Sequence, residues 1–148
     1  MPNTYTCLHY HIVFSTKNRE PWIATEWCHR LFEYLGGTIR GMGGHSHEVG
    51  GVSDHVHLAI SLKPTHMISK VVQELKKNSS TWIRQEMRIP AFAWQDGYAA
   101  FTVSASVLPD VAAYVRQQEE HHRTRGFREE LEKLLKKSGV SFDPKYLD

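Results

Sequence analysis

Three pairs of histidines, each pair separated by a single residue, are the most distinctive chemical feature of this 148-residue sequence. They are His9/His11, His45/His47 and His55/His57. In a β-strand, side chains two positions apart project to the same face, about 6.6 to 7 Å apart along the backbone, so two imidazoles can converge on one divalent ion. The ten histidines of the chain would form fewer than about one such pair by chance. The excess therefore favours a functional interpretation.

The pair His55/His57 has the best-formed strand around it. On the opposite face of this strand, every position from the residue between the two histidines onward is apolar: Val56, Leu58, Ile60 and Leu62. This apolar face should pack under helices and direct both imidazoles onto the open face of a sheet. Alternatively, the pair is structural or lies on the surface. If the strand that carries His9 and His11 is a neighbour, the four imidazoles could form a zinc cluster.

A second group of chemically capable side chains lies on a helix that we expect from Pro109 to about His122. Tyr114, Gln118 and His121 fall within about 60° of one another around its axis. A phenol can act as a nucleophile, an amide oxygen as a hard ligand for a magnesium-like ion, and an imidazole as an accessory base or ligand. The alternative is that the Tyr114 ring packs at a boundary and its hydroxyl is hydrated.

A row of basic residues marks another helix, which we expect to open at Pro64 and Thr65. Lys70, Lys77 and Arg84 are spaced by seven and project nearly opposite its apolar stripe. Such a row can follow the phosphates of a nucleic-acid backbone, although any solvated helix face has a similar pattern.

These residues depend on a framework of alternating strands and helices. Hydrophobic periodicity predicts the order β-α-β-β-α-β followed by two helices, which is the ferredoxin-like split β-α-β plan of the α+β class. In this plan an antiparallel sheet has helices on one face and leaves the other face open for a site. The expected strands are 6–15, 45–51, 52–62 and 98–104, and the expected helices are 25–42, 65–83, 109–122 and 127–137.

Length and composition predict a single cytoplasmic domain over residues 1–148. The sequence has 41% hydrophobic and 23% charged residues and a net charge of +2, as is typical of a globular protein. No apolar run approaches the roughly 20 residues that span a bilayer, and the N-terminus lacks the pattern of a signal peptide. We therefore expect no membrane association.

Two short motifs give the sequence a family resemblance. DHVHL (Asp54–Leu58) and YVRQQ (Tyr114–Gln118), in this order, resemble the signature of the small HUH single-tyrosine transposases, the insertion-sequence 200-like group and its REP-associated relatives. The segments YHIVFSTKNR, SKVVQELKKNSS and FAWQDGYAAFTVS also resemble that group. The likeness covers roughly residues 5 to 125.

The resemblance implies a role for each motif residue. His55, His57 and Gln118 would hold a divalent ion, Mg²⁺ or Mn²⁺. Tyr114 would attack the scissile phosphate of single-stranded DNA and form a 5′-phosphotyrosine intermediate with a free 3′-hydroxyl, which strand transfer later consumes. The implied substrates are DNA hairpins formed by imperfect palindromes at element ends.

The family pattern leaves some features of this sequence open. It implies a homodimer, with Tyr114 placed in cis or in trans. The histidines that follow Gln118, His121 and His122, could supplement the metal ligands. Two alternative functions are a non-catalytic nucleic-acid-binding module derived from a transposase and a histidine-rich zinc-binding protein.

Overall fold

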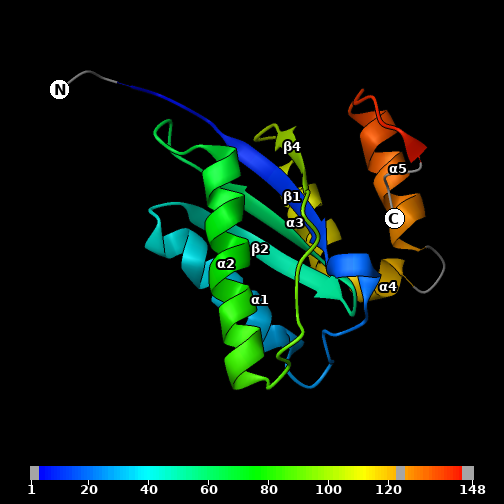
Figure 1. The fold of residues 1–148 in the computed structure, drawn as a ribbon. Coiled ribbons are helices and arrows are strands. Elements are labelled where there is room, and N and C mark those ends of the chain that lie inside the picture. The colour runs from blue at the N-terminus through cyan, green and yellow to red at the C-terminus, as the bar shows by residue number, and fades with distance from the viewer. Residues whose placement is uncertain (1–3, 123–125, 145–148) are drawn as a thin grey trace.

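Among residues 4–122 and 126–144, which the computed structural model describes, four antiparallel strands form one sheet in the order β2-β3-β1-β4 (Figure 1). The strands are β1 (His9–Ser15), β2 (His45–Val52), β3 (His55–Ser61) and β4 (Ala99–Val103). β1 and β3 occupy the centre, and their register pairs Val13 with His57. This strand order is that of the split β-α-β plan, so the predicted ferredoxin-like α+β class is confirmed.

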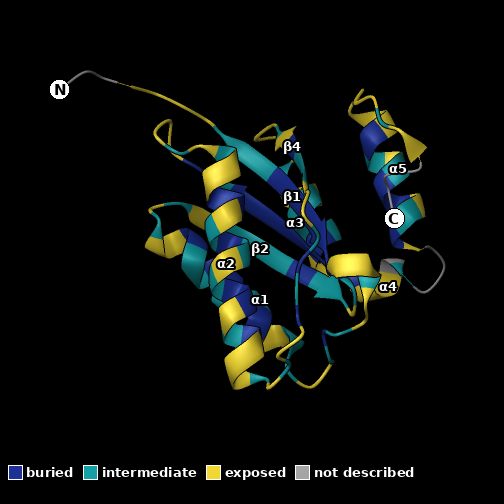
Figure 2. Ribbon diagram, viewed as in Figure 1, coloured by how far each residue is buried: buried dark blue, intermediate teal, exposed yellow. Residues whose placement is uncertain are grey.

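Two crossover helices cover one face of the sheet: α1 (Cys28–Gly41) and α2 (Ile68–Glu86). The main hydrophobic core lies beneath them, where Val56, Leu58 and Ile60 of β3 are fully buried. Figure 2 shows buried positions along the strands beneath α1 and α2. The predicted apolar face of this strand is therefore confirmed. α2 begins at Ile68 rather than at the predicted Thr65, because the first residues after the strand form a turn.

The opposite face of the sheet is covered as well, and here the prediction of an open face was wrong. α3 (Leu108–Arg116) lies on β2 and β3, and α5 (Phe127–Lys137) packs near β1 and β4 (Figure 1). The apolar stripe of α5 needs a partner, and this side of the sheet offers one. The resulting second hydrophobic cluster contains Val13, Phe101, Phe127, Leu131 and Leu135.

The single helix predicted from Pro109 to His122 is two helices in the structure. α3 ends at Arg116, and a short helix, α4 (Gln118–His121), follows Gln117, whose backbone angles are φ −98° and ψ 27°. The Gln117 N–H is shared between two carbonyl oxygens of the preceding turn, which is common at helix ends. No glycine or proline marks this break, so periodicity alone did not reveal it.

The helices of the described residues, 4–122 and 126–144, include none that is long and apolar enough to cross a membrane.

Candidate metal and nucleophile site

β3 directs His55 and His57 to the face opposite the main core, as its alternation predicts. Both side chains are 0% exposed, so the expectation that they would face open solvent was wrong. The second layer of helices covers them, and the ring of Phe127 from α5 lies 4.4 Å from the His55 ring, centroid to centroid. The pair therefore lies in a buried site between the sheet and this layer.

A hydrogen bond to Nδ1 fixes the orientation of each imidazole. Asp54 Oδ1 lies 2.7 Å from His55 Nδ1, and His11 Nε2 lies 2.8 Å from His57 Nδ1. The Nε2 atoms of both rings consequently point toward the same region. Such a contact on the far nitrogen is typical of histidines that bind metal ions, because it sets the tautomer and the ring orientation.

Glu130 of α5 brings a carboxylate into this region. Its Oε1 atom lies 3.0 Å from His57 Nε2, 3.4 Å from His55 Nε2 and 3.0 Å from His122 Nε2. One ligand atom from each of these four side chains lies within 4.8 Å of every other. A single buried oxygen therefore contacts three imidazoles.

The spacing of these atoms suits a divalent ion. With metal-ligand distances of about 2.1 Å, neighbouring ligand atoms lie about 3.0 Å apart in an octahedral site and about 3.4 Å apart in a tetrahedral one. The distances from Glu130 Oε1 to the three imidazole nitrogens, 3.0 to 3.4 Å, fall within this range. The group offers nitrogen and oxygen donors, as is typical of sites for Mn²⁺, Zn²⁺ and related ions.

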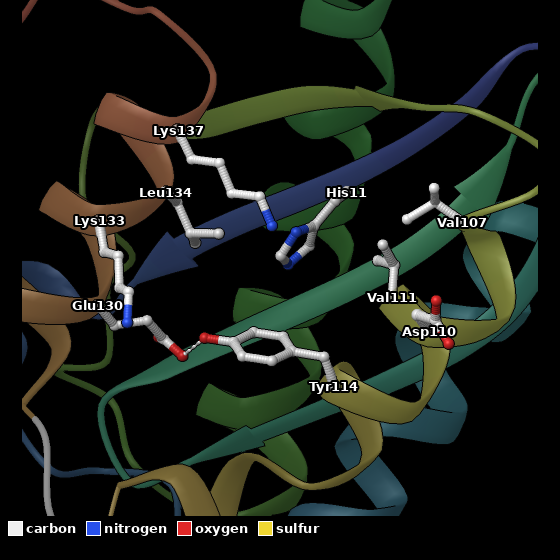
Figure 3. Close-up of a pocket in the computed structure, with 9 residues that line it drawn as sticks. All are labelled: His11, Val107, Asp110, Val111, Tyr114, Glu130, Lys133, Leu134 and Lys137. Carbon is white, nitrogen blue, oxygen red and sulfur yellow. Dashed lines mark hydrogen bonds between the residues drawn. The ribbon is translucent and has the colours of Figure 1, made fainter.

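Tyr114 and Gln118 reach the same site within one chain. The Tyr114 hydroxyl donates a hydrogen bond to Glu130 Oε2 (Figure 3). The Tyr114 ring lies 5.8 Å from that of His57, centroid to centroid. Gln118, which is 1% exposed, places its Oε1 atom 3.4 Å from His55 Nε2. The structure thus brings together Tyr114 and the three predicted metal ligands, in cis.

A glycine allows α3 to lie close enough to the sheet for this arrangement. A Cβ atom at Gly50 of β2 would lie 2.1 Å from the carbonyl oxygen of Val115, far inside van der Waals contact. Only a residue without a side chain permits this approach. Val115 directly follows Tyr114, so Gly50 sets the distance of Tyr114 from the sheet.

Burial keeps the imidazoles nearest the centre of the sheet neutral. It lowers the pKa of His57 to about 4, against the opposing effect of Glu130. Burial, with a further contribution from His57, lowers the pKa of His11 to about 3. A neutral imidazole is the form that binds a metal ion.

The pKa values of two other groups at the site are shifted in the direction that favours their charged forms. Burial alone would lower the pKa of His55, but hydrogen bonds with Asp54 and Glu130 outweigh this effect and raise it. Burial would raise the pKa of Glu130, but hydrogen bonds from the surrounding imidazoles, beginning with that of His122, hold it well below its usual value. The carboxylate is therefore ionised.

The remaining histidine pairs do not join this group. His9 Nδ1 and His47 Nε2 each lie 2.5 Å from Ser61 Oγ, because the sheet register places His9 opposite Ser61. The alternative cluster of four imidazoles, from His9, His11, His55 and His57, is therefore not formed. Of the two β1 histidines, only His11 contacts His57. The side chain of His121, an expected accessory residue, lies outside what the structure describes.

The predicted basic row lies elsewhere. Lys70, Lys77 and Arg84 are exposed on α2, which covers the opposite face of the sheet from Tyr114. Arg84 Nε also donates a hydrogen bond of 2.9 Å to the Phe92 carbonyl oxygen. The structure therefore does not bring this row to the buried site.

Sequence reasoning missed Glu130. A signal was present, because this glutamate interrupts the apolar stripe of its own helix, between Phe127 and Leu134. A carboxylate at such a position must find a buried partner.

The sequence is similar to a known protein family over most of its length. The family model described as "Transposase IS200 like" matches residues 4–118. The chain therefore belongs to the IS200-like transposase family, and it is an enzyme of the transposase class. No curated protein matches the sequence.

Two solved structures share the fold. A proposed transposase from Deinococcus radiodurans R1 is 23% identical, with a TM-score of 0.62 and coverage of 78% of this chain and 94% of that one. A REP-associated tyrosine transposase bound to a REP hairpin is 13% identical, with a TM-score of 0.55 and coverage of 78% of this chain and 70% of that one.

Proposed function

We propose that residues 1–148 form a single metal-dependent transposase domain that cleaves and rejoins single-stranded DNA, with Tyr114 as the nucleophile. His55, His57 and Gln118 would hold Mg²⁺ or Mn²⁺, and His122 and Glu130 lie beside them. One observation supports this proposal above all. The Tyr114 hydroxyl and three imidazoles contact the two carboxylate oxygens of a single residue, Glu130.

In the proposed cleavage, the phosphorus of one phosphodiester linkage passes from a DNA 3′-oxygen to the Tyr114 oxygen. The Tyr114 oxygen forms a bond to phosphorus and loses its proton, while the bond from phosphorus to the 3′-oxygen breaks and that oxygen gains a proton. The products are a 5′-phosphotyrosine and a free 3′-hydroxyl. This covalent link conserves the bond energy, so a 3′-hydroxyl on another end can reverse the step. A bound divalent ion would stabilise charge on the phosphate and leaving oxygens.

The DNA partner follows from the family. The similar REP-associated transposase is bound to a REP hairpin, and this supports a hairpin substrate for the present chain. We further propose that the protein acts in the cytoplasm as a homodimer that holds two DNA ends. The exposed row Lys70, Lys77 and Arg84 is then a candidate contact for parts of the DNA outside the cleavage site.

The test is adduct formation. A labelled single-stranded DNA that carries an imperfect palindrome and its flanks is incubated with the protein and Mg²⁺ or Mn²⁺, then resolved under denaturing conditions. We expect a covalent adduct that requires the ion and is abolished in Tyr114→Phe, while this variant still binds DNA. An adduct that persists in Tyr114→Phe would exclude this nucleophile, and DNA binding without any adduct would favour the non-catalytic module.

A further inference from the structure

A cavity of about 320 Å³ opens directly beside the Tyr114 hydroxyl, between α3 and α5. Tyr114 and Glu130 form one end of it, and His11 of β1 forms part of its wall (Figure 3). The other lining residues come from the two helices: Val107, Asp110, Val111, Lys133, Leu134 and Lys137. α5 lies beyond residue 118, where the family match ends.

The chemistry of the cavity is mixed in a way that suits a nucleotide. Val107, Val111 and Leu134 give it apolar walls, which can contact a base or sugar. The half-buried ring of Tyr114 offers an aromatic surface, and such rings stack on unpaired bases, while the buried His11 imidazole adds a polar group to the wall. A volume near 300 Å³ is at the lower end for small-molecule sites and suits a single nucleotide.

Two lysines of α5 give the cavity a positive rim. Lys133 and Lys137 are one helical turn apart, and Figure 3 shows both side chains reaching from α5 toward the cavity. Within residues 4–122 and 126–144, neither lysine forms an ion pair. Their charges are therefore available to phosphate oxygens.

We propose that this cavity binds the nucleotide adjacent to the scissile phosphate, with Lys133 and Lys137 on the flanking backbone phosphates. The inference rests on the proposed function, since it takes Tyr114 as the point of cleavage. It adds a role for α5, a helix that contributes to substrate binding from outside the region that the family shares.

The lysines can be tested by equilibrium binding without catalysis. The probe is a fluorescein-labelled oligothymidylate about 12 nucleotides long, measured by anisotropy in EDTA at several salt concentrations. For the double variant Lys133→Ala/Lys137→Ala we expect about tenfold weaker binding and a salt slope smaller by about 1.4, since each phosphate contact on a single strand contributes about 0.7. Lys136→Ala is the matched control, because this exposed lysine on the same helix does not line the cavity.

The cavity itself can be tested by filling it. Val107 is 46% exposed at the cavity and Val140 is 44% exposed outside it, so Val107→Trp and Val140→Trp add the same bulk at similarly exposed positions. We expect Val107→Trp alone to weaken binding of the oligothymidylate, about fivefold or more. Equal affinity of both tryptophan variants, or an unchanged salt slope in the double lysine variant, overturns the proposal.

The failure of this inference and that of the proposed function are distinguishable. If the wild type forms the Tyr114 adduct but the cavity variants bind the oligothymidylate like the wild type, the nucleophile stands and the nucleotide site is refuted. If the cavity variants lose binding although no adduct forms, the cavity is a DNA site and the catalytic proposal fails.

Discussion

At the scale of single residues, the site is organised around Nε2 atoms. His55 and His57 alternate with core residues along β3, and hydrogen bonds with Asp54 and His11 hold their respective Nδ1 atoms away from the centre. Both imidazoles are therefore preorganised for the proposed ion, which would reduce the cost of assembling the site. The carboxylate of Glu130 joins these rings to the hydroxyl of Tyr114, the proposed nucleophile.

The first prediction concerns Glu130. The substitution Glu130→Gln keeps the shape of the side chain and its capacity to accept the hydrogen bond of Tyr114, but it removes the negative charge beside three imidazoles. We expect the affinity for Mn²⁺, measured by calorimetry, to fall about 10- to 100-fold, and adduct formation to fall with it. Glu129→Gln, on the exposed side of the same turn, should change neither. Unchanged Mn²⁺ affinity in Glu130→Gln would show that this carboxylate is only structural.

At the scale of elements, the position of Tyr114, the proposed nucleophile, depends on one close approach of α3 to β2. α3 rests on β2 at Gly50, with the Val115 carbonyl directly over it. The distance between Tyr114 and the sheet is therefore set by a contact between two backbones and not by the Tyr114 side chain.

The second prediction tests this contact. In Gly50→Ala the new methyl group would overlap the Val115 carbonyl oxygen, 2.1 Å away, so α3 must move outward. We expect a loss of about 1–3 kcal/mol in the free energy of unfolding, measured by denaturant titration, and at least about a tenfold slower adduct formation. Gly41→Ala is the control, because nothing lies within 4 Å of its added Cβ. A slowed adduct in Gly41→Ala as well would remove the link to the α3 contact.

The helices and strands also show which features of the fold and of the site could be predicted from the sequence. Alternation along β3 correctly separated the imidazoles from Val56 and Leu58, and the four-residue spacing of Tyr114 and Gln118 placed both side chains toward one site. The helix break at Gln117 and the docking of α5 were not predicted, because both depend on tertiary packing. The contact of Glu130 with His57 spans 73 residues, and no local periodicity encodes such a pairing.

At the scale of the whole molecule, the sheet separates two candidate DNA-binding surfaces. One is the cavity rim at Lys133 and Lys137, beside Tyr114. The other is the exposed row on α2, which lies across the sheet (Figure 1). We therefore expect a short single strand bound at the first surface to make no contact with the second.

The third prediction follows from this separation. Lys70→Ala/Lys77→Ala should weaken binding of a long hairpin DNA severalfold and reduce its salt slope, but it should leave the affinity for a short oligothymidylate unchanged. Lys133→Ala/Lys137→Ala should weaken the binding of both DNAs. Anisotropy titrations over a salt series measure these effects. An equal loss for both DNAs in Lys70→Ala/Lys77→Ala would place the α2 row on the path of the short strand.

The stability of the whole fold should also depend on pH, because burial lowers the pKa values of His57 and His11 and keeps these two imidazoles neutral. In the unfolded chain a histidine titrates near its ordinary pKa of 6.5, whereas burial holds the pKa of His57 at about 4 and that of His11 at about 3. Between these values the unfolded chain binds more protons, so acid favours unfolding. The raised pKa of His55 acts in the opposite sense, since its stabilising effect is complete below pH 6.5 and is lost as the pH rises through its folded value.

The fourth prediction is therefore a loss of stability in acid. In EDTA, the free energy of unfolding from denaturant titrations should fall as the pH is lowered from about 6.5 toward 4, by an amount on the order of 5 kcal/mol for the two groups together. His11→Gln removes one of the responsible groups, so its profile should be shallower over this range. His29→Gln, at an exposed position on α1, should follow the wild type. Parallel profiles for His11→Gln and the wild type would mean that the His11 imidazole does not stay neutral in the folded protein.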